Sequence, residues 1–143
     1  MQKMKTGLMM FCLTVLLSCA TLMMNTPTAS AMTLNDLQGD YRVVGGMTSK
    51  TIGCVISLVT ENGELVGKVK KVSPSIKWHV GQTVIQNIFV NQGTIYCQSL
   101  TDGENNDIWS DNDTMLVYNN GGKIKIEWHY AGSKGISMEM NRL

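Results

Sequence analysis

The sequence lacks an excess of either charge, and it contains little histidine. Of its 143 residues, 12 are Lys or Arg and 11 are Asp or Glu, which gives a formal charge of +1. A chain so close to neutral, with no basic stripe, argues against nucleic-acid binding. His79 and His129 are the only histidines, and no Cys or carboxylate stands at a ligand spacing from them. We therefore expect no metal and no cofactor, and both histidines at the surface or rim.

Common catalytic motifs are also missing. The sequence contains no Gly-x-Ser-x-Gly elbow, no zinc-binding helix motif and no phosphate-cradling glycine loop. Cys97 would act as a nucleophile only if it were unpaired and activated, and no histidine lies near it in sequence. These absences predict a protein that is not an enzyme.

Residues 1–31 have the features of a signal peptide. Two lysines make the start positive, an apolar run without charge covers residues 7–24, and Ala29-Ser30-Ala31 is a small-x-small cleavage motif. The run is about 18 residues long, so a retained membrane helix is the alternative. Cleavage after Ala31 predicts an exported protein, periplasmic or extracellular, with a single mature domain over 32–143.

A second processing route is open at Leu16-Leu17-Ser18-Cys19, which looks like a lipoprotein signal. Cys19 would then be lipidated and would anchor the protein to a membrane without spanning it. Two features weigh against this route. Leu17 is less favoured before the small residue, and an apolar stretch follows Cys19 where a polar tether is usual.

The mature domain keeps two of the four cysteines. Removing residues 1–31 leaves 112 of 143 residues, enough for one modest core, and the loss of two lysines changes the formal charge from +1 to −1. Cys54 and Cys97 remain. An even pair in an exported domain predicts a disulfide, with two buried thiols as the alternative.

The mature chain predicts an all-β fold. Thr33 and Asp36 can cap one short helical turn. After it, apolar or alternating runs are separated by turn residues at Asn62-Gly63, 91–93 and 119–122. About eight strands joined by short turns form an up-and-down antiparallel meander, and closure into a small barrel removes its exposed edges. A flattened sandwich is the alternative. The expected strands are 40–46, 51–60, 64–72, 83–90, 94–100, 114–119, 123–130 and 135–142.

The last two strands show which side chains face inward. Their apolar residues alternate with polar ones, so each set occupies one face. The residues expected to line the interior, and to bind a small apolar ligand there, are Tyr41, Ile124, Ile126, Trp128, Tyr130, Met138 and Met140. The alternative is that these side chains fill the interior as an ordinary core.

Two longer segments are expected as loops. Residues 73–81 contain Trp78 and His79, and residues 101–113 carry five carboxylates and no positive charge. The acidic segment does not fit the EF-hand pattern, because Asp107 stands where glycine is required. A solvated loop is the preferred interpretation, and a weak surface calcium site is the alternative.

Several short motifs resemble those of known barrels. Gly39-Asp40-Tyr41 resembles the lipocalin Gly-x-Trp signature with Tyr in place of Trp, and Arg142 resembles the arginine that stacks on that ring. The segment 63–69, Gly-Glu-Leu-Val-Gly-Lys-Val, is similar to a hairpin arm in a family of small exported bacterial proteins with lipocalin-like folds and no established function. The resemblance implies a lipocalin-like (calycin) barrel closed by Tyr41 and Arg142.

Together these features predict an exported, non-enzymatic protein that holds a small hydrophobic or amphipathic ligand in its barrel. The alternative is a protein-interaction module, such as an inhibitor or envelope component, with a filled core. That module would use the segments 73–81 and 101–113.

The two processing routes predict different masses for the mature protein. Intact-mass spectrometry of the secreted form is expected to give a chain starting at Met32, because the Ala29-Ser30-Ala31 motif is the better cleavage site. A lipid-modified chain that starts at Cys19 would contradict cleavage after Ala31.

Overall fold

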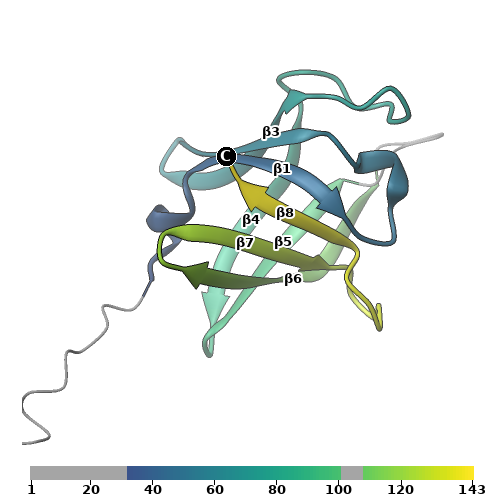
Figure 1. Ribbon diagram of the computed structural model, residues 1–143. Helices are drawn as coiled ribbons and strands as arrows, with labels where there is room; N and C mark the ends of the chain where they lie inside the picture. The colour runs from purple at the N-terminus through teal and green to yellow at the C-terminus, as the bar shows by residue number, and fades with distance from the viewer. Residues whose placement is uncertain (1–31, 101–107) are drawn as a thin grey trace, which may run out of the picture. The chain divides into compact units, whose positions relative to one another are not determined.

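The chain folds into strands that are joined mostly by short turns and that form a closed sheet. The computed structural model describes residues 32–100 and 108–143. A 3₁₀ helix, η1 (Leu34–Leu37), precedes the first strand (Figure 1). A second one, η2 (Ser49–Thr51), follows it. The strands form one closed antiparallel barrel in the order β1 to β8. They are β1 (Gly39–Gly45), β2 (Val55–Glu61), β3 (Glu64–Lys71), β4 (Thr83–Asn91), β5 (Thr94–Leu100), β6 (Trp109–Asn120), β7 (Lys123–His129) and β8 (Met138–Arg142). The predicted all-β meander of eight strands is confirmed.

Three tight hairpins make three of the seven connections that a meander of eight strands requires. The turn between β2 and β3 places Asn62 at φ 52° and Gly63 at φ 81°. Gln92-Gly93 and Gly121-Gly122 also have two consecutive positive φ angles. This backbone matches the right-handed twist of the flanking strands, which is why Asn and Gly dominate such turns. All three turns were predicted from the sequence.

The two ends of the barrel differ. The three hairpin turns and η1 gather at one end, the left and lower part of Figure 1, which we call the helix end. The longer connections 46–54, 72–82 and 130–137 gather at the other end, which we call the loop end. The barrel therefore has one end covered by a short helix and one end surrounded by loops.

The barrel closes where the first strand pairs with the last. Tyr41 lies directly opposite Arg142, and the guanidinium carbon is 5.7 Å from the centroid of the Tyr41 ring. The Tyr41 hydroxyl donates a hydrogen bond of 2.7 Å to the carbonyl of Leu37. Arg142 Nη2 donates to the carbonyls of Asp36, at 3.0 Å, and Gln38. The predicted contact between Tyr41 and Arg142 thus also holds η1 against the helix end.

The predicted helical turn is confirmed, with Thr33 and Asp36 in contact. Asp36 Oδ2 accepts hydrogen bonds from the backbone N of Thr33, at 2.7 Å, and from its hydroxyl, at 2.9 Å. These two bonds are the main reason that the pKa of the Asp36 carboxyl lies below its ordinary value.

Three expected strand boundaries were wrong. The predicted strand 51–60 begins only at Val55, because η2 and Gly53 at φ 92° interrupt the extended backbone. The final strand begins at Met138 instead of residue 135. The largest error concerns the segment 101–113, expected as a loop: β6 already begins at Trp109, which pairs with Leu100 of β5. Residues 101–107 lie outside the described part of the chain, as do residues 1–31.

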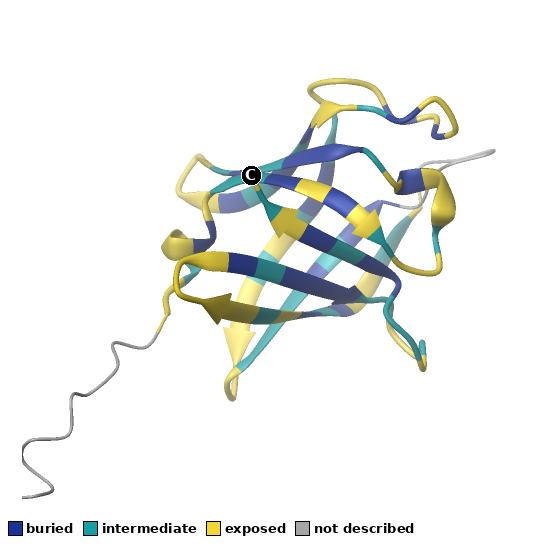
Figure 2. Cartoon of the chain, in the orientation of Figure 1, coloured by how far each residue is buried: buried dark blue, intermediate teal, exposed yellow. Residues whose placement is uncertain are grey.

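Burial alternates along the first and last strands of the barrel (Figure 2). Tyr41 and Val43 on β1 are buried, and Arg42 between them is exposed. On β8, Met138 and Met140 are buried, as the predicted period of two requires. The inward orientation that the sequence predicted for the last strands is therefore confirmed.

Two adjacent glycines, Gly45 at the end of β1 and Gly46 after it, allow a test of how closely residues 137 and 138 approach this part of the chain. Gly46 has φ 122°, and a Cβ placed on it would lie 2.4 Å from the carbonyl oxygen of Ser137. A Cβ on Gly45 would meet nothing within 4 Å. We expect Gly46→Ala to lower the free energy of unfolding by about 3 kcal/mol, because it adds backbone strain and a clash.

The matched variant Gly45→Ala is expected to change stability by less than about 1 kcal/mol. Urea unfolding followed by circular dichroism measures both. Equal losses in the two variants would contradict the close approach of β8 to Gly46.

Candidate functional site

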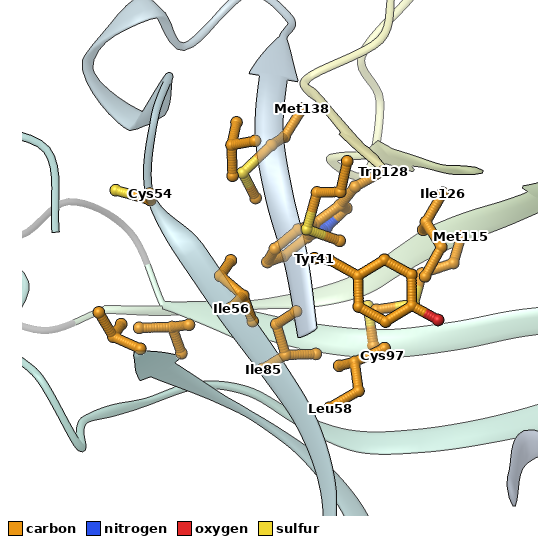
Figure 3. Close-up of a cluster of buried hydrophobic side chains, with 14 of the residues drawn as sticks. Tyr41, Cys54, Ile56, Leu58, Ile85, Cys97, Met115, Ile126, Trp128 and Met138 are labelled. Atoms are coloured by element: carbon orange, nitrogen blue, oxygen red, sulfur yellow. The ribbon is translucent and has the colours of Figure 1, made fainter. Parts of the chain in front are cut away.

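The centre of the barrel is filled by the side chains that the sequence placed inside. Ile126, Trp128 and Met140 have an exposed fraction of 0%, as does Tyr41. A side chain with no accessible surface borders no void large enough for water, so it has neighbours on every side. Figure 3 shows Tyr41, Trp128, Ile126 and Met115 gathered in this cluster. Room for a ligand is therefore found at the margins of the barrel.

The predicted disulfide was wrong. Cys54 and Cys97 are both free and buried, and they lie on opposite sides of the core cluster with Ile56 between them in Figure 3. Cys54 immediately precedes β2 and Cys97 is on β5, and β3 and β4 separate these strands in the barrel. A disulfide needs Cα atoms within about 7 Å, which this separation does not provide.

Each thiol has its own surroundings. The sulfur of Cys54 accepts a hydrogen bond of 3.2 Å from the backbone N of Ser73. Burial, with a smaller contribution from the Asp113 carboxylate, raises the pKa of the Cys97 thiol to about 12. Because the thiolate is the reactive form, Cys97 is poorly suited to act as a nucleophile.

A buried carboxylate at the loop end was not expected from the sequence. Asp113 has an exposed fraction of 0% and accepts hydrogen bonds from the hydroxyls of Ser99 and Ser110. Its Oδ2 also accepts from Trp128 Nε1 at 3.3 Å, and its Oδ1 from the backbone N of Ala131 at 3.0 Å. Asp113 therefore joins β5, β6 and β7 to the turn that follows β7.

The sequence did contain a signal for this residue. Asp113, Met115 and Val117 alternate along β6, and Met115 is buried while Val117 packs against the core. Extending that period backwards by two residues places Asp113 on the inward face. The high acidity of the segment concealed this pattern. Within 32–100 and 108–143, no group of three or more His, Cys, Asp or Glu side chains could hold a metal ion.

A pocket of about 310 Å³ opens at the loop end, beside this carboxylate. We call it the mouth pocket. Its lining consists of Thr48, Lys50, Thr51, Trp78, Ser110, Tyr130 and Ala131. The volume is at the lower end of the range for small-molecule sites, which commonly occur in the mouths of β-barrels.

The mouth pocket combines ring surface with a few hydroxyls. Trp78, at 5% exposure, packs with the core, and Tyr130 is half-buried. The Thr51 hydroxyl donates to the carbonyl of Thr48 at 2.7 Å, and the Ser110 hydroxyl contacts buried Asp113. These bonds fix polar groups at the edge of an apolar surface, an arrangement that orients one end of an amphipathic molecule.

The structure distributes the predicted site residues over three places. Tyr130 lines the mouth pocket. Ile124 belongs to the buried core and also borders a hollow near the helix end, together with Arg142. The remaining five predicted residues lie in the buried core: Tyr41, Ile126, Trp128, Met138 and Met140. Sequence analysis missed Thr48, Thr51 and Ser110. Thr48 and Thr51 lie in the connection between β1 and β2 and Ser110 lies at the start of β6, where no hydrophobic periodicity indicates which side chains face inward.

The histidines lie at the surface or half-buried, as expected. His79 is exposed, and His129 is half-buried on the outward register of β7. His129 Nδ1 is 3.1 Å from the carbonyl oxygen of Gly135, and its Nε2 is 3.8 Å from Glu127 Oε2. Lys125 Nζ donates to Glu127 at 2.8 Å and is the main reason that the pKa of this carboxyl is lowered.

Trp78 does not provide the exposed contact surface expected of an interaction loop. It is buried, and Trp109 is half-buried and packs against the core. The segment 73–81 thus contributes its tryptophan to the interior, which does not match the interaction-module alternative, in which this segment would provide the contact surface.

The barrel defines the class to which the protein belongs, a closed eight-stranded antiparallel β-barrel, the architecture also found in lipocalins. A search with the whole chain against protein-family models, curated proteins and solved structures found no match. In residues 32–100 and 108–143, no helix has the length and apolar character needed to cross a bilayer.

Alkylation tests whether Cys54 and Cys97 are free thiols. Iodoacetamide at about pH 8 is expected to leave Cys97 unmodified in the native mature protein, because the buried thiol forms little thiolate. In denaturant without reductant, both Cys54 and Cys97 are expected to react. A bridged pair would instead react only after a reductant is added, so mass spectrometry of the two denatured samples separates the states.

Proposed function

We propose that this protein is an exported, non-enzymatic binding protein that holds one small amphipathic molecule in the mouth pocket. The observation that supports this proposal most directly is the pocket itself, about 310 Å³ in volume, with Trp78 and Tyr130 in its lining. Export rests on the signal-peptide features of residues 1–31.

The pocket favours a ligand with an apolar body and a polar head. The half-buried ring of Tyr130 supplies most of the aromatic surface, whose burial against a ligand contributes about 25 cal/mol per Å², while Trp78, at 5% exposure, adds little. Thr48, Thr51 and Lys50 supply hydroxyls and a cationic side chain on the same lining. A medium-chain fatty acid has both parts, and its carboxylate is matched to the charge of Lys50.

The hydrogen bonds of the Ser110 hydroxyl in the mouth pocket argue against a catalytic role for it. The Ser110 hydroxyl contacts the Asp113 carboxylate, and its oxygen lies 2.7 Å from the hydroxyl oxygen of Ser99. A nucleophilic serine works with a neighbouring general base that is itself oriented for proton transfer, commonly histidine. Both histidines lie outside the lining of the mouth pocket.

A protein-interaction module is the second candidate. It is favoured by the filled centre of the barrel and by exposed apolar side chains on the outer wall, where Leu116 is 45% exposed and Tyr118 is 42% exposed. This candidate predicts no saturable binding of small amphipathic molecules.

Titration with lauric acid tests the proposal. Because Trp78 lines the pocket, tryptophan emission is expected to change in a saturable way with a stoichiometry of one ligand per chain. Ala131→Phe places a ring in the pocket and is expected to weaken binding by about tenfold or more.

Lys134→Phe is the matched control, since Lys134 is exposed on the same connection and lies outside the pocket lining. It is expected to bind lauric acid as the unmodified protein does. An absence of saturable binding, or equal binding by both variants, would exclude the mouth pocket as the ligand site.

A further inference from the structure

A hollow larger than the mouth pocket, and distinct from the one beside Ile124 and Arg142, lies in the wall of the barrel near the helix end. Its volume is about 700 Å³, and its lining includes Leu34 of η1, Leu65 of β3 and Ile88 of β4. We call it the wall cleft. β3 and β4 share only the partner pairs Gly67–Ile85 and Lys68–Thr83. The cleft borders the halves of these strands nearest the helix end, beyond those pairs.

The lining of the wall cleft is rich in planar polar side chains. Among its described lining residues are four carboxamides and two carboxylates, and none is Lys, Arg or His. They are Asn35, Glu64, Asn87, Gln98, Asp111 and Asn112. Each carboxamide can both donate and accept hydrogen bonds, while each carboxylate accepts them. This lining matches a ligand with many hydroxyl groups and no negative charge.

Two of these side chains belong to residues with a positive φ angle, which changes the direction in which the side chain leaves the strand. Asn87 has φ 49° and Asn112 has φ 60°, and each lies within a strand at an irregularity of the β-ladder. Asn62 and Gln92, which share this conformation, are in hairpin turns where it is expected. Bulges of this kind redirect side chains and are frequent next to binding sites. Both mid-strand bulges bring an asparagine into the same cleft.

Hydrogen bonds hold the polar edge of the cleft in place. Asn87 Nδ2 donates to Gln98 Oε1, which also accepts from Gln86 Nε2 at 3.1 Å. Gln98 Nε2 donates in turn to Asp111 Oδ1. This chain crosses β4, β5 and β6, and it fixes the amide of Gln98 before any ligand arrives. Ordering these groups in advance lowers the entropy lost on binding.

An aromatic ring completes the lining. Phe89 is 49% exposed and lines the cleft, and its ring stacks on Tyr96 with centroids 5.5 Å apart and an interplanar angle of 20°. The face of an aromatic ring carries partial negative charge and attracts weakly positive C–H hydrogens. A sugar ring presents such hydrogens on one face and hydroxyls around its edge.

We propose that the wall cleft binds a neutral oligosaccharide. Its hydroxyls would pair with Asn87, Asn112 and Asp111, while one sugar ring packs against Phe89. Glu64 and Asp111 disfavour acidic sugars, because a carboxylate on the ligand would face like charge. This site is separate from the mouth pocket and does not depend on the function proposed for it.

Nuclear magnetic resonance with ¹⁵N-labelled mature protein tests the proposal. The probes are trisaccharides of glucose, mannose, galactose and N-acetylglucosamine, with trigalacturonic acid as the acidic counterpart. At least one neutral probe is expected to shift the side-chain amide signals of Asn87, Gln98 and Asn112 in a saturable way. The acidic probe is expected to bind about tenfold more weakly than that neutral one.

Matched variants separate a binding role from a structural one. Asn87→Gly keeps a residue that tolerates positive φ but removes the amide, and it is expected to weaken binding about tenfold. Gln92→Gly makes the same change at φ 48° outside the cleft and is expected to have no effect. Phe89→Leu keeps an apolar side chain but removes the flat ring, and is also expected to weaken binding.

Two results would overturn the proposal. One is that no neutral trisaccharide shifts these signals at millimolar concentration. The other is that Asn87→Gly binds as tightly as the unmodified protein, which would mean that the bulge serves only to bend β4.

Discussion

The structure depends on the contact that joins the first strand to the last. Tyr41 and Arg142 face each other across β1 and β8, and the guanidinium lies over the ring. A cation–π contact of this kind contributes about 0.5–2 kcal/mol. Its larger effect is geometric, because pairing β1 with β8 removes both free edges of the sheet. The same arginine hydrogen-bonds to the carbonyls of Asp36 and Gln38, so closure and the position of η1 are one constraint.

Closure of a small barrel leaves little space at its centre, and this decides where a ligand can bind. Trp128, Tyr41 and the two methionines of β8 are buried in the core, so the two hollows proposed as binding sites lie at the loop end and in the wall. They differ in chemistry: the mouth pocket offers ring surface and a lysine, whereas the wall cleft offers amides and carboxylates. One barrel thus presents two surfaces suited to different molecules.

Most of the fold was predictable because it depends on local chemistry. The turn at Asn62-Gly63 and the inward positions of Ile124, Ile126 and Trp128 follow from neighbouring residues, and the structure confirms both. The failures have a common cause. Asp113 was assigned to a solvated loop from its acidic neighbours, and Cys54 was paired with Cys97 from their number and compartment. Each error concerned which strands meet across the barrel.

The sequence by itself determined the number of strands and the inward faces of the last two, because a period of two and a tight turn act over a few residues. The contact of Tyr41 with Arg142 was expected only from the resemblance of these residues to lipocalin motifs. The tertiary structure alone decided that the centre is full, that Asp113 is buried among Ser99, Ser110 and Trp128, and that Asn87 and Asn112 meet in one cleft. These outcomes depend on the curvature and stagger of the closed sheet, which bring together residues far apart in the chain.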